Sequence, residues 1–385
     1  MVLLAARAAT AQPLCARTIA GAYGSDGLIT DIPLTGPSSL TYVPDGSESG
    51  TLLIVRSSGH VLQRANLTSR LMEVLAGSED RIAGLRDGSG RTARLNSPAG
   101  HAVLPGGDVI IADEGNHAVR RYWAAIDQVT TLTGNGTAES RPALDATAGS
   151  VNGPSAVLYN PATGVLLVAE AAGNRISAIL ANGSLVPYAF SGATGSVDAT
   201  SLTASITGPR EMRLGAGGQL YVAENGGNRI RIVWPNTTTT TLCNTAGTIA
   251  SNGDGGPCSD AAVRGPWGLA IHPVTQTLFF SESSANKVRA VFAGPGGNGT
   301  VITVLTNVEL PRGIAFDTAG TRLFVAEWSK GVVTMLVMTT GFAVRLVGNL
   351  DSPIVFAGDG GPASGLISLY LRSTATEPTT GAVFV

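Results

Sequence analysis

Short apolar runs separated by glycine-rich turns recur along the whole chain. In the unit that begins at residue 95, apolar runs at 102–104 and 109–112 and a third strand-like segment at 118–122 are separated by turn residues. Runs this short, bounded by Gly, Pro, Asn and Asp, are typical of β-strands. The chain has no long segment with the 3.6-residue spacing of apolar positions that predicts an amphipathic helix. We therefore expect each unit to be an antiparallel β-meander.

Six copies of this unit follow one another. Each copy opens with a proline just before its first apolar run, and these prolines are Pro37, Pro98, Pro154, Pro209, Pro266 and Pro311. The second run ends in an acidic residue in five copies, namely Asp113, Glu170, Glu224, Glu282 and Glu327. Arg56 stands at this point in the first copy. Proline fits the start of a strand because its missing N–H is not needed there.

The repeat predicts the fold class. Six copies of a four-stranded unit without helices indicate an all-β protein, a β-propeller of four-stranded antiparallel blades, rather than a solenoid or a sandwich. The repeat units are 37–77, 98–134, 154–192, 209–247, 266–305 and 311–348, and a partial unit covers 366–385. Six blades are expected from this count.

The chain ends leave two alternatives open. Residues 17–21 form an outer strand without its blade in this interpretation, and 366–385 form the start of another blade. If these strands paired, a seventh, composite blade would close the ring and hide both sheet edges. The alternative is that the chain is a fragment of a longer protein. Residues 1–16 are interpreted as an N-terminal arm or the remnant of a signal segment, and 17–385 as the propeller.

One segment carries a resemblance to a known family. The pattern V-A-E-x-x-x-N-R-I-R at Val222–Arg231, with the G-D-G-G-P loops and P-x-G strand starts of the other copies, resembles the NHL-repeat family. The resemblance covers about residues 36–348 and implies a propeller, mostly of six blades. The first copy departs from the pattern because it lacks the acid and the Asn. The sixth has Lys330 and Gly331 where the Asn would stand.

The repeated polar residues are interpreted as structural. A residue present in nearly every copy is expected to bond the main chain of the following turn. This interpretation covers the acids named above and a set of asparagines, Asn116, Asn174, Asn228 and Asn286. The Asp-Gly loops lack the alternating oxygen ligands and final Glu of a calcium loop. No metal site and no cofactor are expected.

Cysteines and sequons bear on the compartment. Cys243 and Cys258 flank one loop and could form a disulfide outside the cytosol; the alternative is two free thiols. Five N-glycosylation sequons fall in expected turns, at Asn66, Asn135, Asn182, Asn236 and Asn298. We expect an extracellular or lumenal protein, which could be part of a longer membrane-anchored one. No transmembrane helix is expected in this chain.

Composition argues against nucleic-acid binding. The net charge is −2, and charged residues make up only 14% of the chain. RNA binding would need a basic face with aromatic side chains for stacking. The chain has four histidines, His60, His101, His117 and His272, which the sequence does not place as a matched set of zinc ligands. It also contains no nucleophile-elbow motif.

Residues outside the repeat pattern are the remaining candidates for binding. They are Arg81, Arg86, Arg91 and Arg94 around one loop, together with His101, His117 and Trp123. We expect a non-enzymatic interaction scaffold that binds a protein or glycan partner through loops on one propeller face. The alternative is a lyase or hydrolase with its site at the central channel, similar to amidating lyases or lactonase-like propellers.

Overall fold

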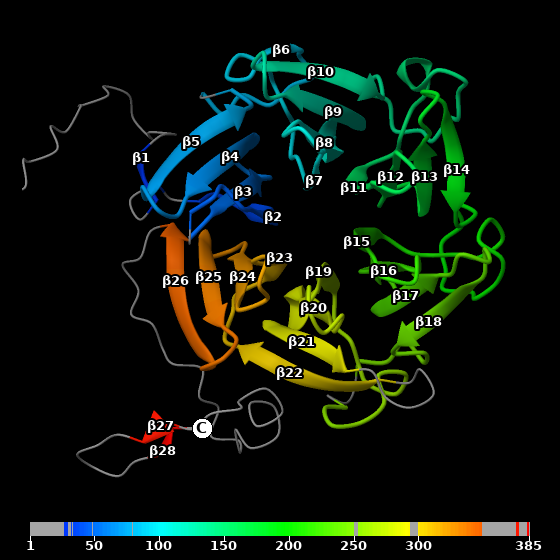
Figure 1. Ribbon diagram of the computed structural model, residues 1–385. Helices are drawn as coiled ribbons and strands as arrows, with labels where there is room; N and C mark the ends of the chain where they lie inside the picture. Colours follow the sequence, from blue (N-terminus) through cyan, green and yellow to red (C-terminus); the bar gives the residue numbers. More distant parts are fainter. Residues whose placement is uncertain are drawn as a thin grey trace, which may run out of the picture.

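Six antiparallel sheets surround a central axis in the computed structural model, which is therefore a six-bladed β-propeller (Figure 1). The structure describes residues 27–29, 32, 34–47, 49–78, 80–249, 253–292 and 299–348, and the main chain of 375–376 and 383–384. The N-terminal segment 1–16, the strand expected at 17–21, Asn298 and most of the partial unit 366–385 lie outside the described residues.

The first three blades use the chain in order, from the innermost strand outwards. Blade one contains β2 (Pro37–Val43), β3 (Thr51–Arg56), β4 (Val61–Asn66) and β5 (Leu71–Ala76). Blade two contains β7 (Gly100–Val103), β8 (Val109–Asp113), β9 (Ala118–Trp123) and β10 (Gln128–Thr133). Blade three contains β11 (Pro154–Asn160), β12 (Val165–Glu170), β13 (Arg175–Ile179) and β14 (Leu185–Ala189).

The last three blades follow the same order. Blade four contains β15 (Pro209–Leu214), β16 (Leu220–Glu224), β17 (Arg229–Val233) and β18 (Thr239–Cys243). Blade five contains β19 (Pro266–Ile271), β20 (Leu278–Glu282), β21 (Lys287–Phe292) and β22 (Thr300–Thr306). Blade six contains β23 (Pro311–Phe316), β24 (Arg322–Glu327), β25 (Val332–Val337) and β26 (Phe342–Gly348).

Short additional elements extend two blades. The two-residue strand β1 (Gly27–Leu28) pairs with β5, and β6 (Gly88–Ser89) pairs with β10, so blades one and two each gain a fifth strand. In the described residues, helix is limited to three single turns, and none of these could cross a bilayer. The strands β27 (Ala375–Thr376) and β28 (Val383–Phe384) pair only with each other.

The hydrophobic core lies between adjacent blades. One cluster, for example, joins Leu53 and Leu62 of blade one to Val109 and Ile111 of blade two. The core between the blades also contains an aliphatic residue three positions before each opening proline. These residues are Leu34, Leu95, Val151, Ile206, Val263 and Val308. They are almost completely buried, so each connecting segment acts as part of the core between two blades.

The ring closes between blades six and one without a composite blade among the described residues. β2 packs against β23, and the connecting segment before Pro37 lies in the seam. Its Leu34 N–H donates to the Gly331 carbonyl of blade six at 3.3 Å, and the Gly348 N–H of β26 donates to the Ile29 carbonyl at 2.8 Å. The expected six blades are thus confirmed.

Glycines permit close approach of the innermost strands at the axis. A Cβ atom on Gly100 would lie 2.6 Å from the Ser155 carbonyl oxygen of the next blade. A Cβ atom on Gly313 would lie 2.6 Å from the Cα atom of Ser39. Real Cβ atoms do not approach other atoms this closely, so glycine is required two residues after the proline in blades two and six, whereas blades one, three and four have Ser39, Ala156 and Glu211 there.

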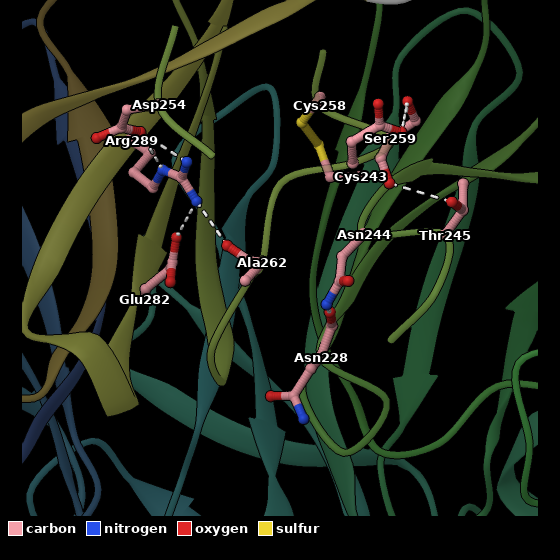
Figure 2. Close-up of a disulfide and its surroundings, with 11 residues drawn as sticks. Asn228, Cys243, Asn244, Thr245, Asp254, Cys258, Ser259, Ala262, Glu282 and Arg289 are labelled. Carbon is pink, nitrogen blue, oxygen red and sulfur yellow. Dashed lines mark hydrogen bonds and ion pairs between the residues drawn. A yellow bond between two sulfur atoms is a disulfide. The ribbon is translucent and has the colours of Figure 1, made fainter. Parts of the chain in front are cut away.

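A disulfide joins Cys243, at the end of β18, to Cys258 in the loop that leads to blade five (Figure 2). Both cysteines are fully buried. The loop between them carries Asp254, which pairs with Arg289 of β21 at 2.6 Å. The disulfide therefore fixes the loop that presents Asp254 to Arg289 of blade five.

Candidate functional site

One face of the propeller is defined by the starts of the innermost strands, and we call it the proline face. The side chain that follows each opening proline lies on this face beside the axis; in chain order these residues are Ser38, Ala99, Ser155, Arg210, Trp267 and Arg312. In five blades the strand pairing shifts register just after the proline, which is a β-bulge. A bulge redirects a side chain away from the regular alternation of a strand.

The ring of residues after the prolines is asymmetric. In blades one to three the residue is small and buried, as for Ser38 and Ser155. In blades four to six it is large and half-buried, namely Arg210, Trp267 and Arg312. One half of the channel mouth is therefore lined by cationic and aromatic side chains that have no counterpart in the other half.

These three side chains stack on one another and on a fourth. The Arg210 and Arg312 guanidinium carbons lie 4.3 and 4.0 Å from the centroid of the Trp267 ring. Arg312 also lies 4.2 Å from the centroid of the Trp328 ring, the residue that follows β24. We call this set, Arg210, Trp267, Arg312 and Trp328, the Trp–Arg ladder. Cation–π contacts of this kind fix the orientation of each planar group.

Polar contacts hold the two ends of the ladder. At one end, Arg210 Nη1 donates to Glu114 Oε1 at 2.7 Å. At the other end, Trp328 Nε1 donates to Ser57 Oγ at 3.1 Å. Glu114 and Ser57 each follow the second strand of their blade, as Trp328 does. The ladder and its two end contacts therefore join side chains from five of the six blades. Its side chains are thus ordered before any ligand binds.

Arg312 differs from Arg210 in its electrostatic environment. Burial, and to a smaller extent the nearby Arg210, lowers the pKa of Arg312 to about 10, so it is still a cation at neutral pH. Among the described residues, its guanidinium has no ion pair and no hydrogen bond. The ladder therefore carries one neutralised and one uncompensated cation.

Three of the four histidines make structural hydrogen bonds. His60 Nδ1 accepts from the Ser97 N–H at 2.9 Å, and His117 Nδ1 accepts from the Gly153 N–H at 3.0 Å. His272 Nδ1 accepts from two N–H groups of its own hairpin turn. Within the described ranges, no three metal-binding side chains lie together.

His101 lies at the other end of the channel. A cavity of about 430 Å³ there is lined by all six innermost strands and includes Tyr42, His101, Tyr159, Arg213 and Phe316. Burial, followed by the charge of Arg213, lowers the pKa of His101 to about 3, so the imidazole is neutral. Both ring nitrogens are shielded from solvent and have no hydrogen-bond partner in the described residues. Arg213 is itself paired with Glu211 at 2.6 Å.

The repeated acids bond the segment before the proline, not the following turn. Each carboxylate accepts from the main-chain N–H two residues before the proline of its own blade. The pairs are Asp113 with Asn96, Glu170 with Asn152, Glu224 with Thr207, Glu282 with Arg264 and Glu327 with Glu309, at 2.7 to 2.9 Å. The acid therefore holds the connecting segment onto its blade.

A second repeated residue joins each blade to the next. It lies four residues after the acid, has a positive φ, and accepts from the N–H just before the next proline. Its members are His60, His117, Asn174, Asn228 and Asn286. The structure places His117, not Asn116, at this position; Asn116 instead donates to Asp113 and to the Gly84 carbonyl. His117 is thus a repeat residue, although the sequence pattern left it among the non-repeated candidates.

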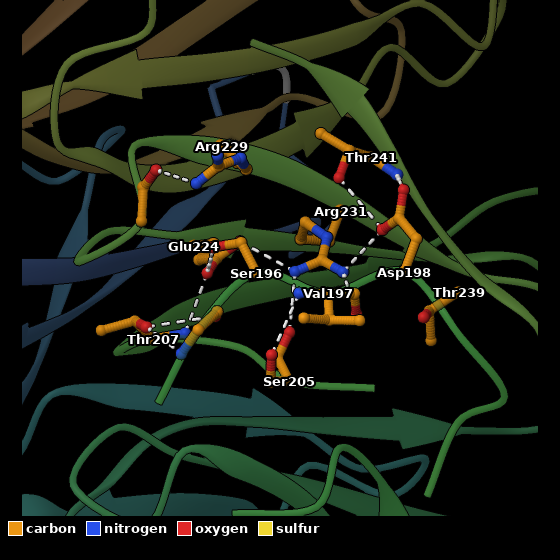
Figure 3. Close-up of polar contacts among 12 residues, drawn as sticks. Ser196, Val197, Asp198, Ser205, Thr207, Glu224, Arg229, Arg231, Thr239 and Thr241 are labelled. Atoms are coloured by element: carbon orange, nitrogen blue, oxygen red, sulfur yellow. Dashed lines mark hydrogen bonds and ion pairs between the residues drawn. The ribbon is translucent and has the colours of Figure 1, made fainter. Parts of the chain in front are cut away.

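Buried arginines complete three blades, and the sequence reasoning missed them. Arg231 of β17 donates to Glu224 at 3.0 Å and to Asp198 at 2.7 Å (Figure 3). Arg120 and Arg289 make the equivalent contacts in blades two and five. In the sequence, these arginines could have been recognised by their position seven residues after the acid. Ser177 and Thr334 occupy this position in blades three and six.

The basic loop and Trp123 lie apart from the Trp–Arg ladder. The main-chain carbonyls of Arg86 and Arg94 accept from the buried Arg120, so this loop has a structural role. Trp123 is the last residue of β9, and its ring stacks on the guanidinium of Arg121. Of the four loop arginines, Arg86 and Arg91 are exposed and Arg81 and Arg94 are half-buried.

The ladder residues could have been found from the sequence. Arg210, Trp267 and Arg312 occupy one position of an aligned repeat, and Glu114 and Trp328 occupy another. Both positions vary between copies, while the proline that precedes the first is constant and the acid that precedes the second is present in five copies. A position that differs among structurally equivalent copies, on a face where the backbone is constant, is a signal for binding.

Comparisons with known proteins agree with this fold. The NHL repeat family model matches residues 95–122, which confirms the resemblance for this unit. No curated protein matches the chain. Among solved structures, the chain is similar to virginiamycin B lyase from Staphylococcus aureus, with a TM-score of 0.52, 19% identity, and coverage of 86% of this chain and 87% of that one.

Two further solved structures share the architecture. A gluconolactonase from Xanthomonas campestris has a TM-score of 0.51 and 14% identity, and the match covers 78% of this chain and 86% of that one. A chain of the nidogen–laminin complex has a TM-score of 0.52 and 11% identity, with coverage of 76% and 91%. Likeness at these identities concerns the fold alone, because one fold hosts many functions.

Proposed function

We propose that this propeller is a non-enzymatic interaction module that binds a protein or glycan partner on its proline face. The observation that carries the proposal is the Trp–Arg ladder, which occupies one half of the channel mouth. The equivalent positions of the other blades carry different, smaller side chains. Tryptophan and arginine are the side chains most often found at the energetic centre of interfaces. Stacking orders them in advance, which lowers the entropy cost of binding.

The fold by itself does not select between binding and catalysis. Solved propellers with this architecture include a lyase, a gluconolactonase and a protein found in a complex with laminin. The choice must therefore rest on side chains. The ladder itself consists of indoles and guanidiniums, which bind well but do not act as nucleophiles or general bases at neutral pH. The carboxylate in contact with it, Glu114, is paired with Arg210.

We further propose that the protein works outside the cytosol. The disulfide between Cys243 and Cys258 supports this, because such bonds persist in oxidising compartments. Three sequon asparagines, Asn135, Asn182 and Asn236, are exposed in turns where a glycan has room. Detecting the intact disulfide and glycans in protein from its natural source would test the location.

The binding proposal is tested by a double variant of the ladder. Trp267→Ala with Trp328→Ala removes both indoles, and we expect it to abolish capture of partners that the wild-type protein retains from cell-surface and secreted fractions. The matched control is Trp123→Ala, which removes another indole stacked on an arginine, away from the proline face. Equal capture by the double variant and the wild type, or no capture together with turnover of a small substrate, would reject the proposal.

The second candidate is a lyase or hydrolase at the central channel. The cavity of about 430 Å³ at the other end of the channel supports it, because enzyme sites are concave and few per protein. This candidate requires measurable turnover, for example of a gluconolactone, or a bound metal by elemental analysis. It also requires that His101→Ala or Arg213→Ala lower the turnover. Without turnover or metal, the binding proposal stands alone.

A further inference from the structure

The guanidinium of Arg312 lies against two indole rings and has no ion pair or hydrogen bond among the described residues, although the charge of Glu114 partly offsets its own. Its carbon is 4.0 Å from the centroid of Trp267 and 4.2 Å from that of Trp328. Stacking uses the two faces of the planar group and leaves its edge, which carries the N–H donors, without a protein acceptor. A guanidinium edge of this kind is suited to two parallel hydrogen bonds with an oxyanion.

Among the described residues, the other arginines that stack on aromatic rings each pair with a carboxylate, which Arg312 does not. Arg121 stacks on Trp123 at 3.5 Å and pairs with Asp108 through two nitrogens, at 3.1 and 2.7 Å. Arg210 stacks on Trp267 and pairs with Glu114. Three further arginines that lie over aromatic rings, Arg231, Arg289 and Arg322, pair with carboxylates as well. Among these six arginines, Arg312 alone has no carboxylate partner at contact distance in the described residues.

We propose that Arg312 is the receptor for a side-chain carboxylate, from an Asp or Glu residue of a protein partner. The inference rests on the proposed binding function and specifies its chemistry. The carboxylate would complete the arrangement that the other stacked arginines already have. Apolar residues next to it in the partner would cover the exposed parts of the two indoles.

The charge of the mouth favours a single carboxylate over a polyanion. A sulfated glycan is held by several spaced cations, and its affinity comes mainly from their sum. In the ring of residues after the prolines the cations are Arg210 and Arg312, and Glu114 neutralises Arg210. One uncompensated charge beside a large aromatic area therefore fits an acidic side chain within an apolar peptide segment.

The neighbouring main chain favours a side chain over a chain terminus. Terminal carboxylates are usually held by several free main-chain N–H groups. Next to Arg312, the Gly268 N–H donates to Ser281 Oγ at 2.8 Å, and Ser281 Oγ donates to the Arg312 carbonyl at 2.7 Å. The Gly268 N–H is therefore not free for a terminal carboxylate, whereas the guanidinium edge of Arg312 is, in the part of the chain that the structure describes.

The test uses the four tryptophans as reporters. The full chain is labelled with 5-fluorotryptophan, and the four ¹⁹F signals are assigned by single Trp→Phe variants. The probe is the capped peptide acetyl-Ala-Leu-Glu-Leu-Ala-amide, and the matched peptide has Gln in place of Glu. We expect the Glu peptide to shift the signals of Trp267 and Trp328 saturably, and to leave Trp123 and Trp234 unchanged.

Substitutions separate the charge from the shape of the receptor. Arg312→Gln should abolish the saturable shifts, and Arg312→Lys, which keeps the charge but not the planar fork, should weaken binding about tenfold. Arg121→Gln is the control, because Arg121 stacks on an indole but already has its carboxylate. Unchanged Trp123 and Trp234 signals in Arg312→Gln would show that the fold is intact.

Several results would overturn the inference. Equal shifts with the Glu and Gln peptides, or full binding to Arg312→Gln, would show that the guanidinium does not bind the carboxylate. Tighter binding of the Gln peptide with a free C-terminus, or of a heparin-derived oligosaccharide, would assign a chain end or a glycan instead. These titrations need no natural partner. A failed titration with successful capture would therefore reject the carboxylate inference alone, and failed capture with a successful titration would bear only on the proposed partner binding.

Discussion

At the scale of single residues, repeated and non-repeated positions have different roles. In blades two to six, the N–H two residues before the opening proline is held by the acid of its own blade, as Asn96 is by Asp113. The next N–H is held by the side chain of the preceding blade, as Ser97 is by His60. These bonds fix the backbone, so the residue after the proline can vary without disturbing it. Binding chemistry, as at Arg312, can therefore be placed on a constant frame.

His60 gives one junction a dependence on pH. Its Nδ1 must be unprotonated to accept from Ser97, and burial holds the pKa of His60 below the ordinary value of 6.5. As the pH falls through 6.5, the unfolded chain therefore binds a proton before the folded protein does, and stability falls. His60→Asn, which keeps the acceptor found at Asn174 and Asn228, should lose less stability on acidification than the wild type. His60→Ala should cost about 1 kcal/mol at neutral pH.

Urea unfolding of the three proteins at several pH values measures this effect. The comparison between His60→Asn and the wild type cancels the other titrating groups, because they are common to both chains. Parallel stability curves for the wild type and His60→Asn between about pH 5 and pH 7, a range that includes the ordinary histidine pKa of 6.5, would contradict the prediction.

At the scale of strands and loops, much of the fold could be predicted from the sequence. The prolines, the acids and the short apolar runs placed the innermost and second strands, because each marks a local requirement of a strand. The contacts of the loops could not be predicted in the same way. Asp254 and Arg289 are 35 residues apart, and only the packing of the long loop along β22 of blade five brings them together. The pairing of Arg312 with two indoles is non-local for the same reason.

The loop closed by Cys243 and Cys258 should contribute strongly to the stability of blades four and five. The bond spans 15 residues, and closing a loop of this length in the unfolded chain is worth about 3 kcal/mol. We expect the double variant Cys243→Ala and Cys258→Ala to lose about this much free energy of unfolding. Urea unfolding with dithiothreitol should lower the wild type to the level of the variant. If the reductant changes both proteins equally or neither, the prediction is wrong.

At the scale of the whole molecule, ring closure was the feature that the sequence left open. A composite seventh blade and a fragment were both compatible with the strand-like ends. In the described residues, six blades close through β2 and β23, with Ile29, Ile32 and Leu34 buried in the seam. The sequence could not show this, because blade number depends on the angle between adjacent sheets, which side chains across each interface set together.

The seam between blades six and one is built differently from the other five junctions. Gly331 stands where the others have His or Asn, so no side chain there can accept from the N–H just before Pro37. Its carbonyl instead accepts from the Leu34 N–H, three residues before that proline. Its φ is +64°, and a Cβ atom there would overlap the Leu34 carbonyl. Gly331→Ala should therefore lower the free energy of unfolding by about 1–3 kcal/mol more than Gly→Ala at another positive-φ glycine whose Cβ position is open.

Gly183→Ala is that control, because Gly183 has a φ of +86° and nothing within 4 Å of its Cβ position. Urea unfolding gives the two losses of free energy, and hydrogen exchange locates them. In Gly331→Ala, the Leu34 and Gly348 amides, which bond across the seam, should exchange faster than the Ser97 amide of the first junction. Since a closed ring is only as stable as its weakest junction, equal losses in the two variants would mean that closure is not limited by this seam.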